Sequence, residues 1–384
     1  MYIKRQGEAF LEKTLKSPKV GIILGARQVG KTTLVKHVIG NRKVLFLNLD
    51  IDVDKQRLIA VSSLPPADAV KALGHPDIII IDEAQRLLDV GRIVKGWYDS
   101  GVSSKVILLG SSSLDILNQS AESLTGRNEK MFLPPLLFPE IVSAQSWFLN
   151  NISKEKILND FEKQINELLM QSLVFGSYPE VVTTAEKQIF LLNLASDYLM
   201  KDVLNLGLVK NPDTVKRLLM LLAHQVGSEV SINELSIGMG VSRVTVERYI
   251  DLLERTYVIF KLPAFSTNPR KEINKSKKIY FWDTGVRNAL LNDFSLSPLR
   301  PDIGSLWENW VVAEFAKKNA LAGGLENLYF WRSRDGSEVD LIVKNGNVMR
   351  AYEIKWQKQS VNKRQFSSWY KIPVKVIDRT QPFI

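Results

Sequence analysis

The stretch "GARQVGKTTL" (residues 25–34) follows the apolar run "VGIILG" and precedes a helical pattern. It fits G-x-x-x-x-G-K-[ST], a motif that needs such a strand before it and a helix after it. Its two glycines allow the backbone N–H groups to face phosphates, while Lys31 reaches the β- and γ-phosphates and Thr32 offers a hydroxyl to Mg²⁺. The sequence therefore predicts an ATP and Mg²⁺ site formed by Gly25, Ala26, Arg27, Gln28, Val29, Gly30, Lys31, Thr32 and Thr33.

A second apolar run, "PDIIIIDEAQ" (76–85), supports hydrolysis as well as binding. Its four consecutive isoleucines predict a buried parallel strand that ends in Asp82 and Glu83. We expect Asp82 to hold Mg²⁺ through water and Glu83 to polarise the attacking water.

A third strand, "KVILLGSSS" (105–113), ends at the height where a γ-phosphate sensor is expected, and Ser111 is the residue chosen. Arg127 closes the helical stretch that follows. An arginine there can reach the phosphate of a neighbouring subunit and stabilise transition-state charge. The alternative is that Arg127 caps the carboxyl end of its helix.

The phrases "GARQVGKTTL", "IIIIDEAQ", "SSSLDILNQSAESLTGR", "FGSYPEVV" (175–182) and "IYFWDTGVRNALL" (279–291) resemble a widespread prokaryotic family of AAA+-superfamily ATPases. Members of that family carry a C-terminal domain of unknown function. The resemblance spans nearly the whole chain and implies an AAA+-like core, with Arg127 at the arginine-finger position and a homo-oligomeric ring or partial ring. One departure is that "GSYPE" stands where many AAA+ lids place a sensor 2 arginine.

Apolar residues at three- and four-residue spacing predict a helical lid after the core. Residues 230–265 then read as a short helix, a glycine-containing turn, a second helix capped by Ser242 and a strand, which is the order of a winged helix-turn-helix. Such a module binds DNA, although some winged helices bind proteins. The expected DNA contacts are Arg243, Thr245, Arg248, Arg270, Lys271, Lys275, Lys277 and Lys278.

The net charge of +10 is concentrated in two stretches. Residues 261–288 hold seven basic and two acidic side chains, and residues 355–379 hold seven and one, giving +5 and +6. A localised basic surface favours a nucleic-acid partner bound through its phosphates, largely without reading sequence, although a solvated charged face is the alternative.

Composition excludes several classes of protein. Without cysteine there is no disulfide, thiolate metal site or cysteine nucleophile, and three dispersed histidines argue against zinc. No signal peptide or membrane span is expected, so the predicted location is the cytoplasm and no membrane partner is expected.

Near the C-terminus, "GSEVDLIVKNGNVMRAYEIKWQK" (336–358) predicts a hairpin that turns at Asn345 and Gly346. That turn would place Asp340 opposite Ala351 and diagonal to Glu353, with Lys355 on the same face. Together with Glu308 from a preceding helix, these residues resemble the PD-(D/E)XK nuclease constellation. That resemblance implies a second Mg²⁺ or Mn²⁺ held by Glu308, Asp340 and Glu353, with Lys355 orienting water. An exposed charged face, or a nuclease fold kept only to bind DNA, are the alternatives.

The expected fold class is α/β. It comprises an AAA+-like P-loop core with a parallel sheet (1–145), a helical lid (146–226), a winged helix that binds DNA (227–291) and a restriction-endonuclease-like α/β domain (292–384). The expected function is a Mg²⁺-dependent ATPase that binds and remodels DNA, with forked or branched DNA as candidate substrates. Two alternatives remain open: an NTP-operated switch that binds proteins, and an ATP-gated DNA nuclease.

Overall fold

The computed structural model of the chain describes residues 2–111, 124–148, 153–198, 211–266, 277–333, 335–360 and 364–384. Contacts divide the chain into two compact units, one of residues Lys4–Pro134 and one of Met1–Ile3 with Pro135–Ile384. Within the described segments, no helix has the length and apolar character to cross a bilayer.

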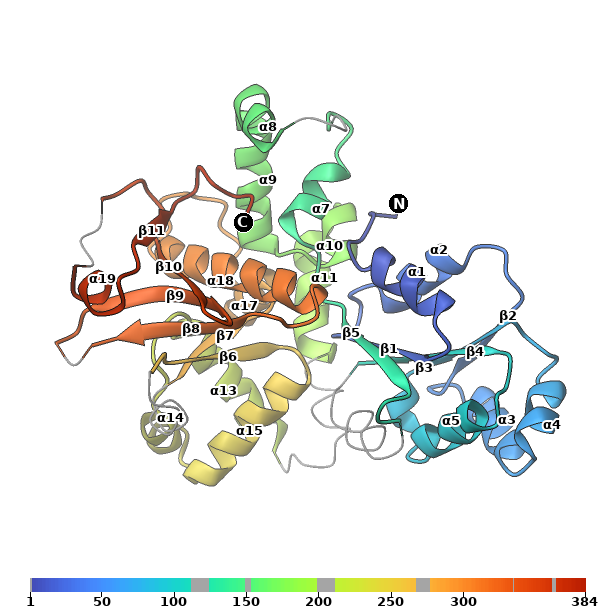
Figure 1. The fold of residues 1–384 in the computed structure, drawn as a ribbon. Coiled ribbons are helices and arrows are strands. Elements are labelled where there is room, and N and C mark those ends of the chain that lie inside the picture. The colour runs from blue at the N-terminus through green and yellow to red at the C-terminus, as the bar shows by residue number, and fades with distance from the viewer. Residues whose placement is uncertain are drawn as a thin grey trace. The chain divides into compact units, whose positions relative to one another are not determined.

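The unit of Lys4–Pro134 contains a five-stranded parallel sheet in the order β2-β3-β4-β1-β5. Figure 1 shows α1 and α2 on one face of this sheet and α3, α4 and α5 on the other. The elements are α1 (Glu8–Lys16), β1 (Val20–Leu24), α2 (Lys31–Ile39), β2 (Val44–Asn48), α3 (Asp52–Ser62), α4 (Pro66–Ala72), β3 (Ile78–Asp82), the 3₁₀ turn η1 (Ala84–Arg86), α5 (Val90–Asp99), β4 (Lys105–Gly110) and β5 (Asn128–Phe132).

Burial explains why the apolar runs of this unit form strands. Every residue of β1 and β3 is buried, as expected for central strands covered by helices on both faces. Strand β4 lies between β1 and β3, so the loops that follow these three strands meet at one edge of the sheet. This arrangement confirms the predicted α/β class, and it brings together residues that are about 85 positions apart in sequence.

Helices open the second unit, and their bounds are α7 (Phe138–Ser143), α8 (Lys154–Asp160), α9 (Glu162–Phe175), α10 (Pro179–Thr183), α11 (Lys187–Asn193), the π-helix η2 (Leu194–Tyr198) and α13 (Pro212–His224). The apolar residues of α9 and α13 recur at helical spacing and are buried, among them Leu169, Leu173, Leu218 and Leu222. This helical pattern is the one read from the sequence.

Two further helices and a hairpin follow: α14 (Ile232–Met239), α15 (Arg243–Arg255), β6 (Ile259–Pro263) and β7 (Lys277–Phe281). Gly240 ends α14 in the left-handed conformation, and the Ser242 hydroxyl accepts the Thr245 N–H at the start of α15. Strands β6 and β7 pair antiparallel, and Glu229 bridges to Lys278. The order α14, turn, α15 and β6 thus matches the one predicted for residues 230–265.

The C-terminal part consists of α17 (Thr284–Leu291), α18 (Ile303–Leu321), β8 (Asn327–Arg332), β9 (Glu338–Asn345), β10 (Val348–Ile354), α19 (Arg364–Tyr370) and β11 (Val374–Ile377). Its sheet has the order β11-β10-β9-β8, in which β8, β9 and β10 run antiparallel and β11 runs parallel to β10. Phe366 from α19 packs with Trp331, Val339 and Ile342 of the sheet.

Candidate functional site

The loop between β1 and α2 requires glycine at two positions. A Cβ on Gly25 would lie 2.3 Å from the Leu133 carbonyl oxygen, and Gly30 has a φ of 91° directly before α2. Any residue larger than glycine at position 25 would force the backbone to shift. The positive φ of Gly30 disfavours any residue with a side chain at position 30. The glycines of the motif therefore set the curvature of the loop.

Lys31 and Thr32 stand on the first turn of α2, at the mouth of this loop. The Lys31 ammonium donates to the carbonyls of Gly25 and Ala26, each at 2.9 Å. The Thr32 hydroxyl donates to the Asp82 carboxylate at 2.6 Å, which joins the loop to the end of β3. Hydroxyl and carboxylate oxygens suit Mg²⁺, and the loop amides with Lys31 suit phosphates, so these residues fit ATP with its metal.

Glu83 follows Asp82 and takes a φ of 50°, in the left-handed region. Its carboxylate accepts hydrogen bonds from the Gln85 amide and from the Ser111 hydroxyl, the latter at 3.2 Å. The Gln85 amide also donates to the Ser111 oxygen at 2.9 Å. Ser111, expected as a phosphate sensor, thus contacts the carboxylate predicted to polarise water. Reasoning from sequence missed Gln85, because its role depends on β3 and β4 being neighbours.

Arg5 is a second residue without a motif. Its buried guanidinium donates to the carbonyl of Val29, within the phosphate-binding loop, at 2.8 Å, and to the carbonyl of Pro134 at 2.6 Å. Pro134 is the last residue of this unit. One side chain therefore joins the loop to the point where the chain leaves the unit.

Arg127 lies at the amino-terminal end of β1, whereas the phosphate-binding loop follows the carboxyl-terminal end of that strand. Its carbonyl accepts the Val20 N–H at the start of β1. A five-residue strand places these two ends about 13 Å apart, at roughly 3.3 Å per residue. The guanidinium donates to Asp99 at 2.6 Å. Arg127 is therefore turned away from the nucleotide site of its own chain.

The phrases "FGSYPEVV" and "IYFWDTGVRNALL" form a buried polar network in the second unit. The Asp283 carboxylate accepts the Ser177 N–H at 2.7 Å, and Lys317 donates to the Ser177 hydroxyl at 2.8 Å and to Glu314 at 3.0 Å. Burial, opposed by the charge of Lys317, raises the pKa of both Asp283 and Glu314. Gly176 must lack a side chain because a Cβ there would lie 1.9 Å from Asp283. The residues of these two stretches therefore connect α9, α17 and α18 through buried hydrogen bonds.

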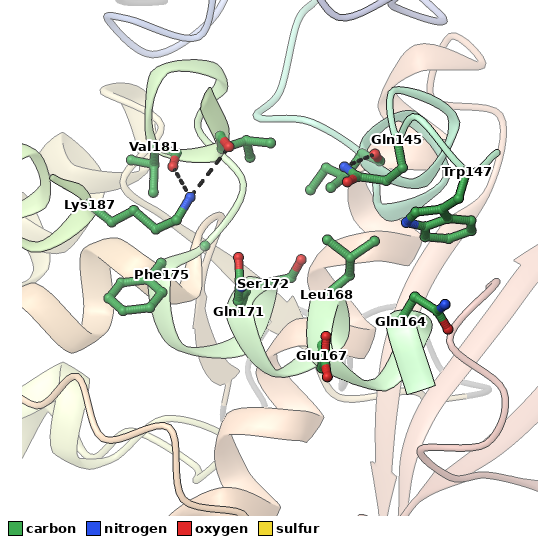
Figure 2. A pocket seen from close by; sticks show the side chains of 13 residues that line it. Gln145, Trp147, Gln164, Glu167, Leu168, Gln171, Ser172, Phe175, Val181 and Lys187 are labelled. Carbon is green, nitrogen blue, oxygen red and sulfur yellow. Dashed lines mark hydrogen bonds between the residues drawn. The ribbon is translucent and has the colours of Figure 1, made fainter. Parts of the chain in front are cut away.

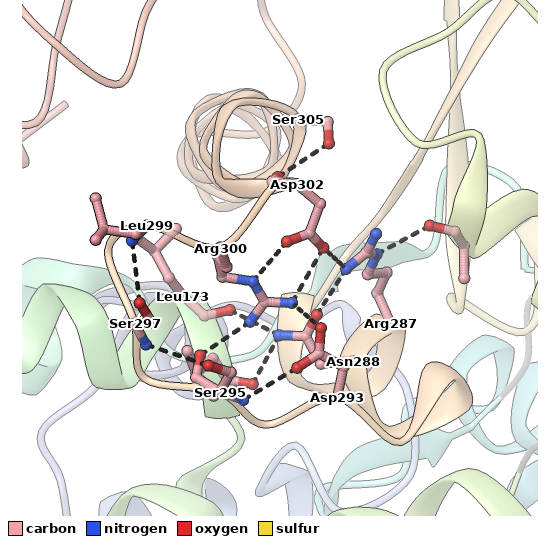
Figure 3. Close-up of polar contacts among 12 residues, drawn as sticks. Leu173, Arg287, Asn288, Asp293, Ser295, Ser297, Leu299, Arg300, Asp302 and Ser305 are labelled. Carbon is pink, nitrogen blue, oxygen red and sulfur yellow. Dashed lines mark hydrogen bonds and ion pairs between the residues drawn. The ribbon is translucent and has the colours of Figure 1, made fainter.

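Figure 3 shows a neighbouring network in which two arginines share one carboxylate. Arg300 donates to Asp302 at 2.6 Å and to Asp293 at 3.0 Å, and Arg287 also pairs with Asp302. Burial works against ionisation of Asp302, but hydrogen bonds from Arg300 and Arg287 lower its pKa below the ordinary value. The network joins the end of α17 to the start of α18.

A cavity of about 270 Å³ lies between α7, α9 and α11 (Figure 2). Lys187 donates to the Val181 carbonyl at its rim at 2.6 Å, and burial lowers the pKa of Lys187. Gln145, Gln164 and Gln171 also line it. The thirteen residues drawn around it include none of the residues predicted from sequence to form a site.

The predicted DNA contacts are distributed unequally. Arg243 and Arg248 are exposed on α15, Thr245 is half-buried beside Ser242, and Lys277 is exposed at the start of β7. Lys278 is 2% exposed and pairs with Glu308 at 3.1 Å and with Glu338. Its burial corrects the expectation that Lys278 lies on a basic surface. Arg270, Lys271 and Lys275 lie outside the described residues.

The C-terminal hairpin turns one residue later than predicted. Asn345 pairs with Val348, so Gly346 and Asn347 form the turn, and Gly346 takes the positive φ of 56° that a type II′ turn needs at its first central position. Continuing this register places Asp340 opposite Glu353 rather than opposite Ala351. The two carboxylates are thus direct cross-strand neighbours.

Glu308, Asp340, Glu353 and Lys355 do come together. The Lys355 ammonium lies 2.8 Å from Glu353 and 3.6 Å from Asp340, and Tyr280 donates to Glu308 at 2.7 Å. Burial, opposed by the Lys278 ammonium and reinforced by the charge of Asp340, raises the pKa of Glu308 to about 7. Across the described residues, no three acidic or histidine side chains are placed to share a metal ion.

Comparison with known families divides the chain into three matched regions. Residues 17–142 match a family described as an AAA domain. Residues 166–297 and residues 303–381 match two families described as domains of unknown function, DUF8612 and DUF4143.

Proteins similar along nearly the whole chain occur in bacteria and archaea. The chain is 28% identical to the uncharacterized protein Rv2008c of Mycobacterium tuberculosis, over 92% of this chain and 74% of that one. It is 24% identical to the uncharacterized protein MJ1544 of Methanocaldococcus jannaschii, over 93% and 79%. The fold is similar to that of the Walker-type ATPase paby2304 of Pyrococcus abyssi, with a TM-score of 0.53, 16% identity, and coverage of 76% of this chain and 96% of that one. Residues 17–142 are therefore an ATPase-like P-loop domain of the AAA type.

Proposed function

We propose that the unit of Lys4–Pro134 hydrolyses ATP with Mg²⁺. The observation that carries this proposal is the 2.6 Å hydrogen bond between Thr32 and Asp82, which sets two oxygen ligands beside the phosphate-binding loop. The loop amides and Lys31 would hold the phosphates, and Glu83 would polarise the attacking water. Bound Mg²⁺ would neutralise charge on the phosphates.

We further propose that residues 227–291 act as a winged helix that binds DNA. The bridge from Glu229 to Lys278 joins the segment before α14 to the β6–β7 hairpin, which supports a winged-helix arrangement of α14, α15 and the hairpin. Arg243, Arg248 and Lys277 are exposed on this module and would contact phosphates. On this proposal residues 146–226 are a lid, and nucleotide turnover alters how the DNA is held, with forked and branched DNA as candidate substrates.

A second candidate function is a switch that binds a protein through the same module. Ile237 on α14 and Val244 on α15 are 73% and 72% exposed. Exposed apolar side chains next to charged ones are typical of protein interfaces as well as of DNA-binding faces.

One experiment separates these functions. We expect ATP turnover by the full chain to rise with single-stranded, duplex, forked or four-way DNA, and the preferred form identifies the substrate. Lys31→Ala should lose nucleotide binding or turnover, because the ammonium that contacts the phosphates is gone. Glu83→Gln should bind ATP but not hydrolyse it. ATP turnover that does not change with any of these DNA forms would favour the protein-binding switch. Normal ATP turnover by Glu83→Gln would show that Glu83 does not polarise the attacking water.

A further inference from the structure

Lys278 occupies an unusual position for a lysine in a basic segment. Its neighbour Lys277 is exposed on β7, but the side chain of Lys278 is 3% exposed. The ammonium lies 3.1 Å from Glu308 of α18, pairs with Glu338 of β9, and lies 5.5 Å from the centre of the Phe330 ring. Three elements that are distant in sequence therefore surround one cation.

The carboxylates of this cluster already have protein donors. One oxygen of Glu308 accepts from both Lys278 and Tyr280, at 3.1 and 2.7 Å. One oxygen of Asp340 accepts the Ile354 N–H at 2.7 Å. The Glu353 carboxylate lies 2.8 Å from Lys355. A divalent ion needs several such oxygens at about 2.0–2.6 Å, so it would compete with two ammonium groups.

Backbone also covers Glu308. Gly227, with a φ of 78°, lies in the turn that leads to α14, and a Cβ there would be 3.3 Å from the Glu308 carboxyl carbon. The acid that a PD-(D/E)XK site needs open to metal and phosphate is thus partly covered by the turn and bonded to two side chains of β7. As folded, these residues do not fit the second Mg²⁺ or Mn²⁺ that the nuclease resemblance implies.

We infer that the ammonium of Lys278 takes the place of a divalent cation in the cluster that it forms with Glu308 and Glu338. The cluster then fastens the β6–β7 hairpin to α18 and β9 and does not act on a phosphodiester. This role is independent of ATP hydrolysis and of DNA binding. Removing this ammonium takes a positive charge from beside Glu308, Glu338 and Asp340. These carboxylates should then move together and bind a metal ion in its place.

Binding of Mn²⁺ tests the inference in the full chain without nucleotide, with free Mn²⁺ measured by electron paramagnetic resonance. The variants are Lys278→Met, the matched control Lys277→Met, and Lys278→Met combined with Asp340→Asn. We expect Lys278→Met to gain a Mn²⁺ site at least about tenfold tighter than any in the wild type. The control should behave like the wild type, and Asp340→Asn should abolish the gain.

Two results overturn the inference. One is a wild-type Mn²⁺ site that depends on Asp340 and is as tight as that of Lys278→Met. The other is a folded Lys278→Met variant without added affinity. If Lys278→Met does not fold, reductive dimethylation of the wild type followed by mass spectrometry decides the question. Lys278 should then react at least about tenfold more slowly than Lys277, because its ammonium is buried in ion pairs, and equal rates contradict its placement.

Discussion

Glu83 gains its orientation from two side chains rather than from its own strand. Gln85 and Ser111 both bond to its carboxylate, and Ser111 comes from the end of the neighbouring strand. A general base works only if its carboxylate is held within reach of the water that it polarises. We therefore treat Gln85 as a positioning residue for the proposed hydrolysis.

Replacing Gln85 tests this role. In Gln85→Ala the carboxylate of Glu83 loses one of its two described donors, and we expect kcat for ATP to fall about tenfold while KM changes little. Ser111→Ala should give a smaller loss in the same direction. Steady-state kinetics would measure both, and a Gln85→Ala variant with an altered KM and an unchanged kcat would show that Gln85 contacts the nucleotide instead.

Among individual residues, the sequence predicts the candidate site residues that belong to a local motif. Lys31, Thr32 and Asp82 were found because their spacing and flanking pattern are fixed by the chemistry of phosphate binding. Lys278 was misplaced because a count of basic residues treats Lys277 and Lys278 alike, although alternate residues of a strand point to opposite faces.

Among the elements, the junction of α9 with α17 has the least room for change. Gly176 ends α9 with a φ of 73°, and an added Cβ would lie 1.9 Å from Asp283. Asp283 cannot move freely, because its carboxylate also accepts the Ser177 hydroxyl at 3.0 Å and the Val286 N–H at 3.2 Å.

Gly176→Ala should therefore lower the free energy of unfolding by about 2 to 4 kcal/mol. The matched control is Gly304→Ala in α18 of the same unit, where an added Cβ meets nothing within 4 Å. That variant should be unchanged or up to about 1 kcal/mol more stable, because alanine favours helix. Denaturant unfolding followed by tryptophan fluorescence would measure both, and equal effects would contradict the packing argument.

The helix-turn-helix and its hairpin should bind DNA through charge. We expect DNA affinity to fall steeply between about 50 and 200 mM salt and to vary little with sequence at fixed DNA shape. Arg248→Ala or Lys277→Ala should weaken binding to all sequences alike and reduce the salt slope by about one. Lys318→Ala, which removes an exposed charge from α18, is the control and should leave the slope unchanged. Fluorescence anisotropy would measure these affinities, and a salt-independent affinity would favour the protein-binding switch.

The order of helices and strands in this region followed from periodicity and capping residues such as Ser242. The register of the C-terminal hairpin did not, because "NGN" (345–347) allows a two-residue turn at either of two positions.

For the whole molecule, the position of Arg127 bears on the homo-oligomer that the family resemblance implies. Arg127 lies at the opposite end of β1 from its own phosphate-binding loop, so an arginine finger at this position would have to act on the nucleotide of a neighbouring chain. That role would require a homo-oligomer, which the sequence predicts through a family resemblance and not through any pattern of its own.

Mixing two inactive variants tests this arrangement. Arg127→Ala should bind ATP without turning it over, and Glu83→Gln should do the same for a different reason. A 1:1 mixture should recover up to about a quarter of wild-type turnover, because about a quarter of random interfaces pair an intact arginine with an intact site. Wild-type turnover by Arg127→Ala alone would leave Arg127 a structural role only, such as its bonds to Asp99 and to the Thr125 carbonyl.

Arg5 has a consequence for the energetics of the chain. Its guanidinium holds the carbonyl of Val29 in the phosphate-binding loop and the carbonyl of Pro134, the residue after which the chain passes to the other unit. If bound phosphate displaces the Val29 carbonyl, the free energy of Arg5's second bond changes with it. By thermodynamic linkage, tension applied to the chain at Pro134 would then also change nucleotide affinity. A mechanical load carried by residues 135–384 would thus be felt as a change in the dissociation constant for ATP.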